Sequence, residues 1–139
     1  MLKSIKKLGL IFILFIFCFL FCGCDNTKPY LTFNANPITQ KTVYDAQKFF
    51  KPGQTIHYAL FMPKGFDQEY LRIQIVKRAE NIAQGGITIY MAKDLFIDTS
   101  KKFYIDRFVI NQTGTFVVRF FYGNRVDKPF AENILWVKE

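Results

Sequence analysis

Thiol groups are the most reactive side chains in this sequence, and all of them lie near its beginning. Cys18, Cys22 and Cys24 are the three cysteines of the 139-residue chain, so no disulfide is expected within residues 25–139. Cys22 and Cys24 are close enough to form a metal-binding or redox pair, but no further Cys and only one His follow them. The pair stands at the end of a long apolar run and has to be interpreted together with that run.

The rest of the sequence offers few groups for catalysis. A hydrolase needs a nucleophile beside a general base, a pair of carboxylates, or a metal that activates water. His57 is the only histidine and lies in a predicted strand, and Ser100 is the only serine after residue 23, without a Gly-x-Ser-x-Gly motif. The acidic residues are dispersed and show no calcium-binding spacing: Glu80, Asp94, Asp98 and Asp106. We therefore expect a protein that is not an enzyme and has no metal or cofactor.

The N-terminal segment has the organisation of a signal peptide. Residues 1–7 carry three lysines and no acidic residue, and residues 8–22 form an apolar run of 15 residues. A membrane-spanning helix needs about 20 apolar residues, so the run is short for a permanent anchor. Cleavage is the favoured interpretation, and an uncleaved N-terminal helix is the alternative.

Four residues at the end of this run resemble the lipobox of bacterial lipoproteins. They are Phe21, Cys22, Gly23 and Cys24, an apolar, a variable and a small residue followed by cysteine. Phe21 replaces the commonest residue, Leu, and with Cys22 the motif resembles the looser lipoboxes of spirochaete lipoproteins. The resemblance implies a signal peptide over residues 1–23, cleavage between Gly23 and Cys24, and palmitate or a related lipid on Cys24. It places the protein in the bacterial cell envelope, anchored by lipid and facing the periplasm or the cell surface. Asp25 resembles an inner-membrane retention signal of some enteric lipoproteins, which leaves the choice of membrane open.

Net charge limits the partners of the exported part. Removing Lys3, Lys6 and Lys7 with the signal peptide leaves 16 basic residues against 11 acidic ones, a net charge of +5. The basic residues are dispersed and not interleaved with aromatic ones, and export separates the protein from the genome, so no nucleic-acid partner is expected. The 116 residues that remain are enough for one domain.

The pattern of apolar residues predicts an all-β domain. Residues 24–36 are polar and are interpreted as a tether whose Tyr30 to Phe33 could follow a sheet edge, and residues 37–139 as a single antiparallel β-sandwich. Strands are predicted over 56–62, 70–76, 87–91, 103–110, 116–122 and 133–138, with one helical turn over 45–50. The strand over 116–122 is apolar on both faces except at Arg119, which is typical of a central strand.

The end of the chain resembles the last two strands of bacterial immunoglobulin-like domains. Residues 114–119 read Gly-Thr-Phe-Val-Val-Arg, and after a loop residues 134–137 read Ile-Leu-Trp-Val. The resemblance implies an immunoglobulin-like sandwich. It covers about 30 residues, and the expected mature part departs from the family in lacking a disulfide pair and in carrying Trp136 on its final strand.

With little support for catalysis, these observations favour a function in binding another molecule through the protein surface. Four polar side chains are predicted at outward positions of strands and could gather on one sheet face: Arg72, Gln74, Arg107 and Arg119. We expect an adaptor or structural protein that binds a protein partner. Binding of envelope glycans or another anionic carbohydrate is the alternative, supported by the positive charge and the many aromatic residues.

Overall fold

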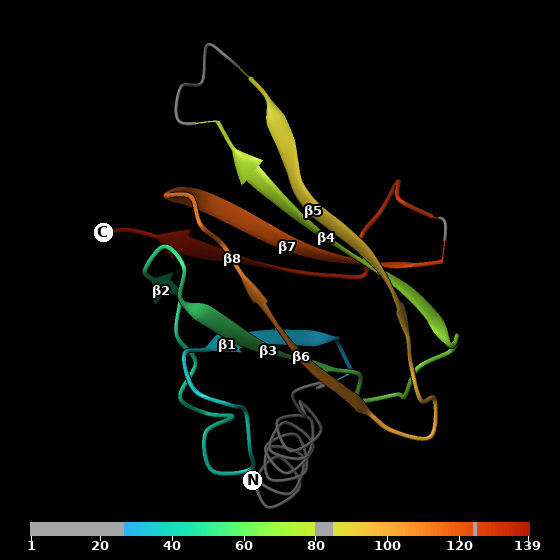
Figure 1. Ribbon diagram of the computed structural model, residues 1–139. Coiled ribbons are helices and arrows are strands. Elements are labelled where there is room, and N and C mark those ends of the chain that lie inside the picture. The colour runs from blue at the N-terminus through green and yellow to red at the C-terminus, as the bar shows by residue number, and fades with distance from the viewer. Residues whose placement is uncertain (1–26, 80–84, 124) are drawn as a thin grey trace, which may run out of the picture.

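The structure, a computed structural model, describes residues 27–79, 85–123 and 125–139 (Figure 1). The predicted signal peptide, its cleavage site and Cys24 lie outside these residues. The described residues contain eight strands in two sheets and no helix. The strands are β1 (Tyr30–Asn34), β2 (Phe49–Phe50), β3 (Thr55–Phe61), β4 (Tyr70–Arg78), β5 (Ile87–Phe96), β6 (Phe103–Val109), β7 (Gly114–Tyr122) and β8 (Ala131–Val137).

The two sheets differ in size, and the chain passes several times from one to the other. One has three antiparallel strands in the order β1-β3-β6, and the other has five in the order β2-β8-β7-β4-β5. All pairings are antiparallel except that of β2 with β8, which is parallel. The connections from β3 to β4 and from β5 to β6 therefore pass from one sheet to the other (Figure 1).

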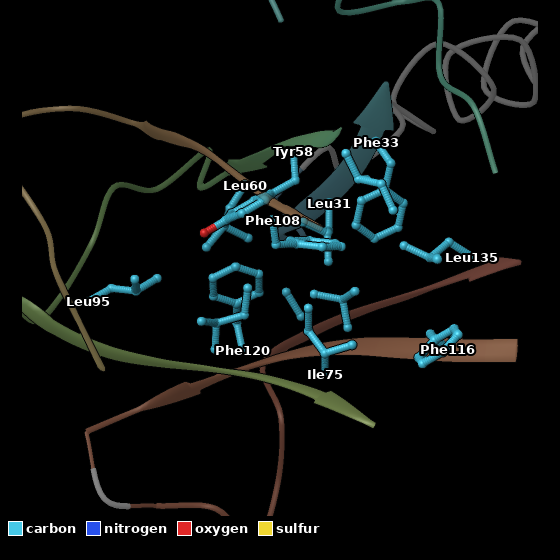
Figure 2. Close-up of a cluster of buried hydrophobic side chains, with 14 of the residues drawn as sticks. Leu31, Phe33, Tyr58, Leu60, Ile75, Leu95, Phe108, Phe116, Phe120 and Leu135 are labelled. Carbon is cyan, nitrogen blue, oxygen red and sulfur yellow. The ribbon is translucent and has the colours of Figure 1, made fainter. Parts of the chain in front are cut away.

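The core fills the space between the two sheets (Figure 2). Alternation within each strand places every second side chain on the inner face. Tyr58 and Leu60 of the three-stranded sheet meet Ile75 and Phe120 of the five-stranded sheet, and all four are almost completely buried. Burial of such a side chain contributes about 1.5 to 3 kcal/mol, so the two inner faces hold the sandwich together without a disulfide in residues 25–139.

The predicted all-β fold with two sheets is confirmed, and the inward residues of two predicted strands are confirmed with it. Ile56, Tyr58, Leu60 and Met62 are buried together, and so are Leu71, Ile73 and Ile75. The predicted helical turn over 45–50 is wrong, because turns occupy residues 40–44 and β2 begins at residue 49.

The folded part begins within the range that was interpreted as a tether. β1 lies inside residues 24–36, pairs with β3 along its whole length, and buries Leu31 and Phe33 in the core. The loop that follows is fixed to β1 by Asn34, whose Nδ2 donates to the carbonyl oxygens of Thr42 and Asp45 at 3.2 and 3.0 Å. Residues 30–36 thus contribute to the domain that was expected to begin at residue 37.

Candidate binding face

The outer face of the five-stranded sheet carries three of the four polar residues singled out from the sequence. Arg72 and Gln74 of β4 and Arg119 of β7 point away from the core, and Gln74 lies directly opposite Arg119. All three are partly buried. Two carboxylates on the neighbouring strands complete this polar row, Asp94 of β5 and Glu132 of β8.

Arg72 and Asp94 form the strongest ion pair of the polar row. Arg72 Nε lies 2.7 Å from Asp94 Oδ1 and Arg72 Nη2 lies 3.0 Å from Asp94 Oδ2, a bidentate arrangement between residues that are cross-strand partners. Hydrogen bonds from Arg72 lower the pKa of Asp94, and those same bonds raise the pKa of Arg72. The guanidinium is therefore already occupied by a carboxylate of its own sheet.

Arg119 is paired less closely. Its Nε lies 3.5 Å from Glu132 Oε2, and this nitrogen is buried and makes no hydrogen bond with the described residues. The contact is an electrostatic attraction between cross-strand neighbours, not a hydrogen bond. Both arginines of the polar row thus face a negative charge, so the row is close to neutral.

A row of apolar side chains runs beside the polar row across all five strands. Register and alternation place its members on the same outer face: Phe49, Trp136, Ile134, Val117, Val76, Ile89 and Ile87. Val76 of β4 and Val117 of β7 are buried, whereas Phe49, Ile87 and Ile89 on the two edge strands are exposed by 62, 58 and 58%. Phe49 stacks on Trp136 with ring centroids 5.2 Å apart. We call these seven residues the apolar row.

Arg107 lies apart from the other three predicted residues. It belongs to β6 of the three-stranded sheet, where it faces outward opposite His57 of β3. The four side chains therefore do not gather on one face, because the two sheets turn their outer faces in opposite directions (Figure 1).

The groups considered for catalysis are scattered over the described residues. His57 has Asn34 and Arg107 as cross-strand neighbours, and no described carboxylate pairs with it. Asp98 accepts hydrogen bonds from the backbone and hydroxyl of Ser100, which lower its pKa. A hollow of about 730 Å³ beside Phe49 has Glu139 as its single acidic residue. No group of three metal-ligating side chains occurs within residues 27–79, 85–123 and 125–139.

A polar cluster closes the side of the sandwich between β5 and β6. Lys93 Nζ lies 3.5 Å from Asp106 Oδ2, and the Tyr104 hydroxyl donates to the same oxygen at 3.3 Å. Burial and the neighbouring Asp106 raise the pKa of Tyr104 to about 12, and burial also raises the pKa of Tyr58. These contacts join the two sheets at their edges and indicate a structural role.

The sequence predicted three members of the polar row, Arg72, Gln74 and Arg119, but not the apolar row. The missed signal was the outward position of Ile134 and Trp136 in a strand whose other face is also apolar. A strand that is apolar on both faces indicates either burial or a contact surface on its second face.

No protein-family model matches this chain, and no curated protein matches it either. Within the described residues, no helix is long and apolar enough to cross a membrane. The class of protein that the fold defines is an all-β protein with two stacked sheets.

Acid should weaken the contribution of the Arg72–Asp94 pair to stability. The folded-state pKa of Asp94 lies below the value of about 3.9 in an unfolded chain, so its ionised form favours folding. This contribution is complete above about pH 5 and is lost as pH falls through the folded-state pKa. Urea unfolding of the wild type and of Asp94→Asn should show a smaller difference in unfolding free energy at pH 3 than at pH 7. Asp127→Asn, which alters an exposed loop carboxylate, is the control. An equal difference at both pH values would contradict the prediction.

Proposed function

We propose that this chain is a lipid-anchored, non-catalytic protein of the bacterial envelope whose sandwich binds a protein partner through the outer face of the five-stranded sheet. The lipobox-like residues 21–24 support the anchor. One observation carries the binding role: the apolar row crosses the whole sheet, is exposed on both edge strands, and runs beside arginines that are already paired with carboxylates. Such a face has apolar area to bury and a polar border.

We also propose that the domain is immunoglobulin-like. The strand order supports this, because β1-β3-β6 and β5-β4-β7-β8 follow the division of strands between the two sheets of such domains. The sequence pattern of residues 114–119 and 134–137 falls on β7 and β8, which pair with each other. Domains of this shape commonly present a sheet face or loops to partners.

The charges of the polar row favour a protein over an anionic glycan. An anionic carbohydrate is bound best by guanidinium groups that are free to form bidentate hydrogen bonds. Arg72 already makes two such bonds with Asp94, and Arg119 faces Glu132 at 3.5 Å. An acidic ligand would have to replace both carboxylates. Aromatic and aliphatic side chains such as Trp136 and Ile134 are instead typical of protein interfaces.

Photo-crosslinking in intact cells tests the binding face. A photoreactive residue at Ile89, in the exposed part of the apolar row, is expected to give one discrete adduct of higher mass. The same residue at Ile105, which is exposed by 41% on the other sheet, is the matched control and should not give that adduct. Protease digestion and mass spectrometry then show whether the adduct contains a second polypeptide.

The adduct must depend on the apolar row. Changing Ile134 to Glu should remove it, because a carboxylate in the middle of a buried apolar contact would lose its solvation. An adduct as strong at residue 105 as at residue 89, or one that still forms in the Ile134→Glu variant, would contradict this assignment of the binding face. An adduct with carbohydrate in place of polypeptide would favour the glycan alternative.

A further inference from the structure

One end of the three-stranded sheet carries a row of aromatic side chains on its outer face. Tyr30 begins β1, Phe61 ends β3 and Phe103 begins β6, and the three are direct cross-strand partners. Their ring centroids are 6.3 Å apart between Tyr30 and Phe61 and 6.5 Å apart between Phe61 and Phe103. Tyr30 and Phe103 are exposed by 52 and 46%. The row therefore presents aromatic surface to its surroundings at the end where the described chain begins.

Four exposed lysines surround this aromatic row. Lys28 precedes β1, Lys64 follows β3, and Lys101 and Lys102 precede β6. The Met62 amide donates to the carbonyl oxygen of Lys102 at 2.8 Å, which keeps the end of β3 beside the start of β6. Among these four lysines, only Lys101 forms an ion pair with a described carboxylate, Asp98, at 3.7 Å. We call these seven residues, Tyr30, Phe61, Phe103, Lys28, Lys64, Lys101 and Lys102, the aromatic–lysine rim.

The five-stranded sheet adds apolar surface at the same end. Tyr70 begins β4 and Phe96 ends β5 as its cross-strand partner, and both point outward and are exposed. Ile97 N donates to the carbonyl oxygen of Glu69 at 2.7 Å, which holds these two strand ends together beside the loop that leads to Phe103. The starts of β1, β4 and β6 and the ends of β3 and β5 lie at one end of the sandwich (Figure 1), and each of these strand ends carries an aromatic residue.

The proposed lipid anchor brings this end to a membrane. Tyr30 lies six positions after Cys24, and six steps of an extended chain span at most about 20 Å. The opposite end of β6 lies about another 20 Å away, since a strand rises about 3.3 Å per residue and Val109 lies six positions after Phe103. The short connection therefore holds the rim, and not the far end of the sheet, close to the lipid headgroups.

We propose that the aromatic–lysine rim rests in the headgroup layer of an anionic bilayer and fixes the orientation of the sandwich on the membrane. This inference rests on the proposed lipid anchor at Cys24. Aromatic rings favour the boundary between headgroups and acyl chains, and lysines beside a membrane are attracted to anionic lipids. The rim combines both groups, with one carboxylate, Asp98, paired with one of its four lysines. With the rim on the membrane, the apolar row on the outer face of the five-stranded sheet stays accessible to a partner.

The position of a single tryptophan tests the orientation. Trp136, the only tryptophan of the chain, lies opposite Thr115 near the other end of the sandwich. The full-length chain is produced in bacteria, and the processed protein is placed in vesicles of phosphatidylglycerol and brominated phosphatidylcholine, whose bromine atoms quench nearby tryptophan fluorescence. The double variant Trp136→Phe/Phe103→Trp moves the single tryptophan into the rim. Quenching of its fluorescence should be several-fold stronger than in the wild type.

A matched variant separates contact through the rim from contact through the whole sheet face. Trp136→Phe/Val109→Trp places the tryptophan on the same outer face of the same strand, where Val109 is exposed by 42%. Its quenching should remain near that of the wild type. Quenching at residue 109 as strong as at residue 103, or no quenching at residue 103, would overturn the proposed orientation.

A second pair of variants tests the lysines. Lys64→Glu/Lys102→Glu in the Phe103→Trp background should reduce the quenching, and raising the salt concentration from 0.1 to 1 M should do the same because the Debye length falls from about 10 to about 3 Å. Lys41→Glu/Lys48→Glu, which alters exposed lysines of the β1–β2 loop, should leave it unchanged. Equal effects of the two pairs would contradict the role of the rim lysines.

Palmitate labelling of the same preparations separates this inference from the proposed anchor. Labelled protein without quenching at residue 103 would support the proposed anchor and contradict the proposed orientation. Absence of both label and quenching would contradict the proposed anchor and, with it, the orientation that rests on it.

Discussion

Replacing Cys24 with Ser is expected to abolish labelling by radioactive palmitate and, with it, the lipid-held mature form of the protein. A serine hydroxyl cannot take the place of the thiol that receives lipid. Each buried methylene contributes about 0.8 kcal/mol to membrane binding, and a single acyl chain gives only marginal attachment. Removing all acyl chains therefore removes the largest part of the affinity of the mature chain for the bilayer and leaves only the weaker contacts of the rim. Mass spectrometry of the wild type should find an N-terminal peptide that begins at residue 24 and carries acyl mass.

The neighbouring thiol supplies a matched control. Cys22→Ser removes a cysteine two residues away that lies within the expected signal peptide, so labelling of the mature protein should not change. Labelling that persists in Cys24→Ser would refute the assignment. An N-terminal peptide that still contains residues 8–22 would instead support the uncleaved helix.

Several strands could be predicted from the sequence because alternation is a property of neighbouring residues. In β4, Leu71, Ile73 and Ile75 alternate with polar residues, and in β3 the bulky apolar residues Ile56, Tyr58 and Leu60 share one face. β7 was recognised as a central strand from its two apolar faces, and it lies between β8 and β4. The division of strands between two sheets depends on contacts between distant residues and could not be read from local patterns.

The length of β5 shows how distant contacts override a local pattern. The predicted strand ended at Met91, before Lys93 and Asp94, but β5 continues to Phe96. Asp94 is paired with Arg72 on the neighbouring strand, and Lys93 with Asp106 on the other sheet. Both charges are compensated by residues that are at least 13 positions away in the sequence, so the strand can include them.

Only the part of the candidate binding face that follows from alternation within single strands could be predicted from the sequence. Arg72 and Gln74 share a face because they are two residues apart in one strand, and the pairing of β4 with β7 adds Arg119. Arg107 follows the same alternation in β6, but β6 belongs to the other sheet. The carboxylates that pair with Arg72 and Arg119 are set by strand register, which the sequence does not display.

The core offers a second large effect, because a domain without a disulfide depends on packing for its stability. Phe120 of β7 is completely buried. Its ring lies 5.8 Å from that of Tyr58 in the opposite sheet and 6.4 Å from that of Phe130, so it joins the two sheets (Figure 2). Loss of this ring would leave a cavity in the middle of the contact, where main-chain pairing on both sides of β7 prevents collapse.

Phe120→Ala should therefore lower the free energy of unfolding by about 3 to 5 kcal/mol, a large part of the 5 to 15 kcal/mol that is usual for a domain. Phe96→Ala, which removes the same ring from a position exposed by 72%, should cost no more than about 0.5 kcal/mol. Urea unfolding followed by circular dichroism measures both, and Phe120→Leu gives a smaller, still measurable loss if the alanine variant does not fold. Equal losses at positions 96 and 120 would mean that the ring of Phe120 does not join the sheets. A much larger loss at position 120 would show that the stability of the sandwich comes from the contact between its two inner faces.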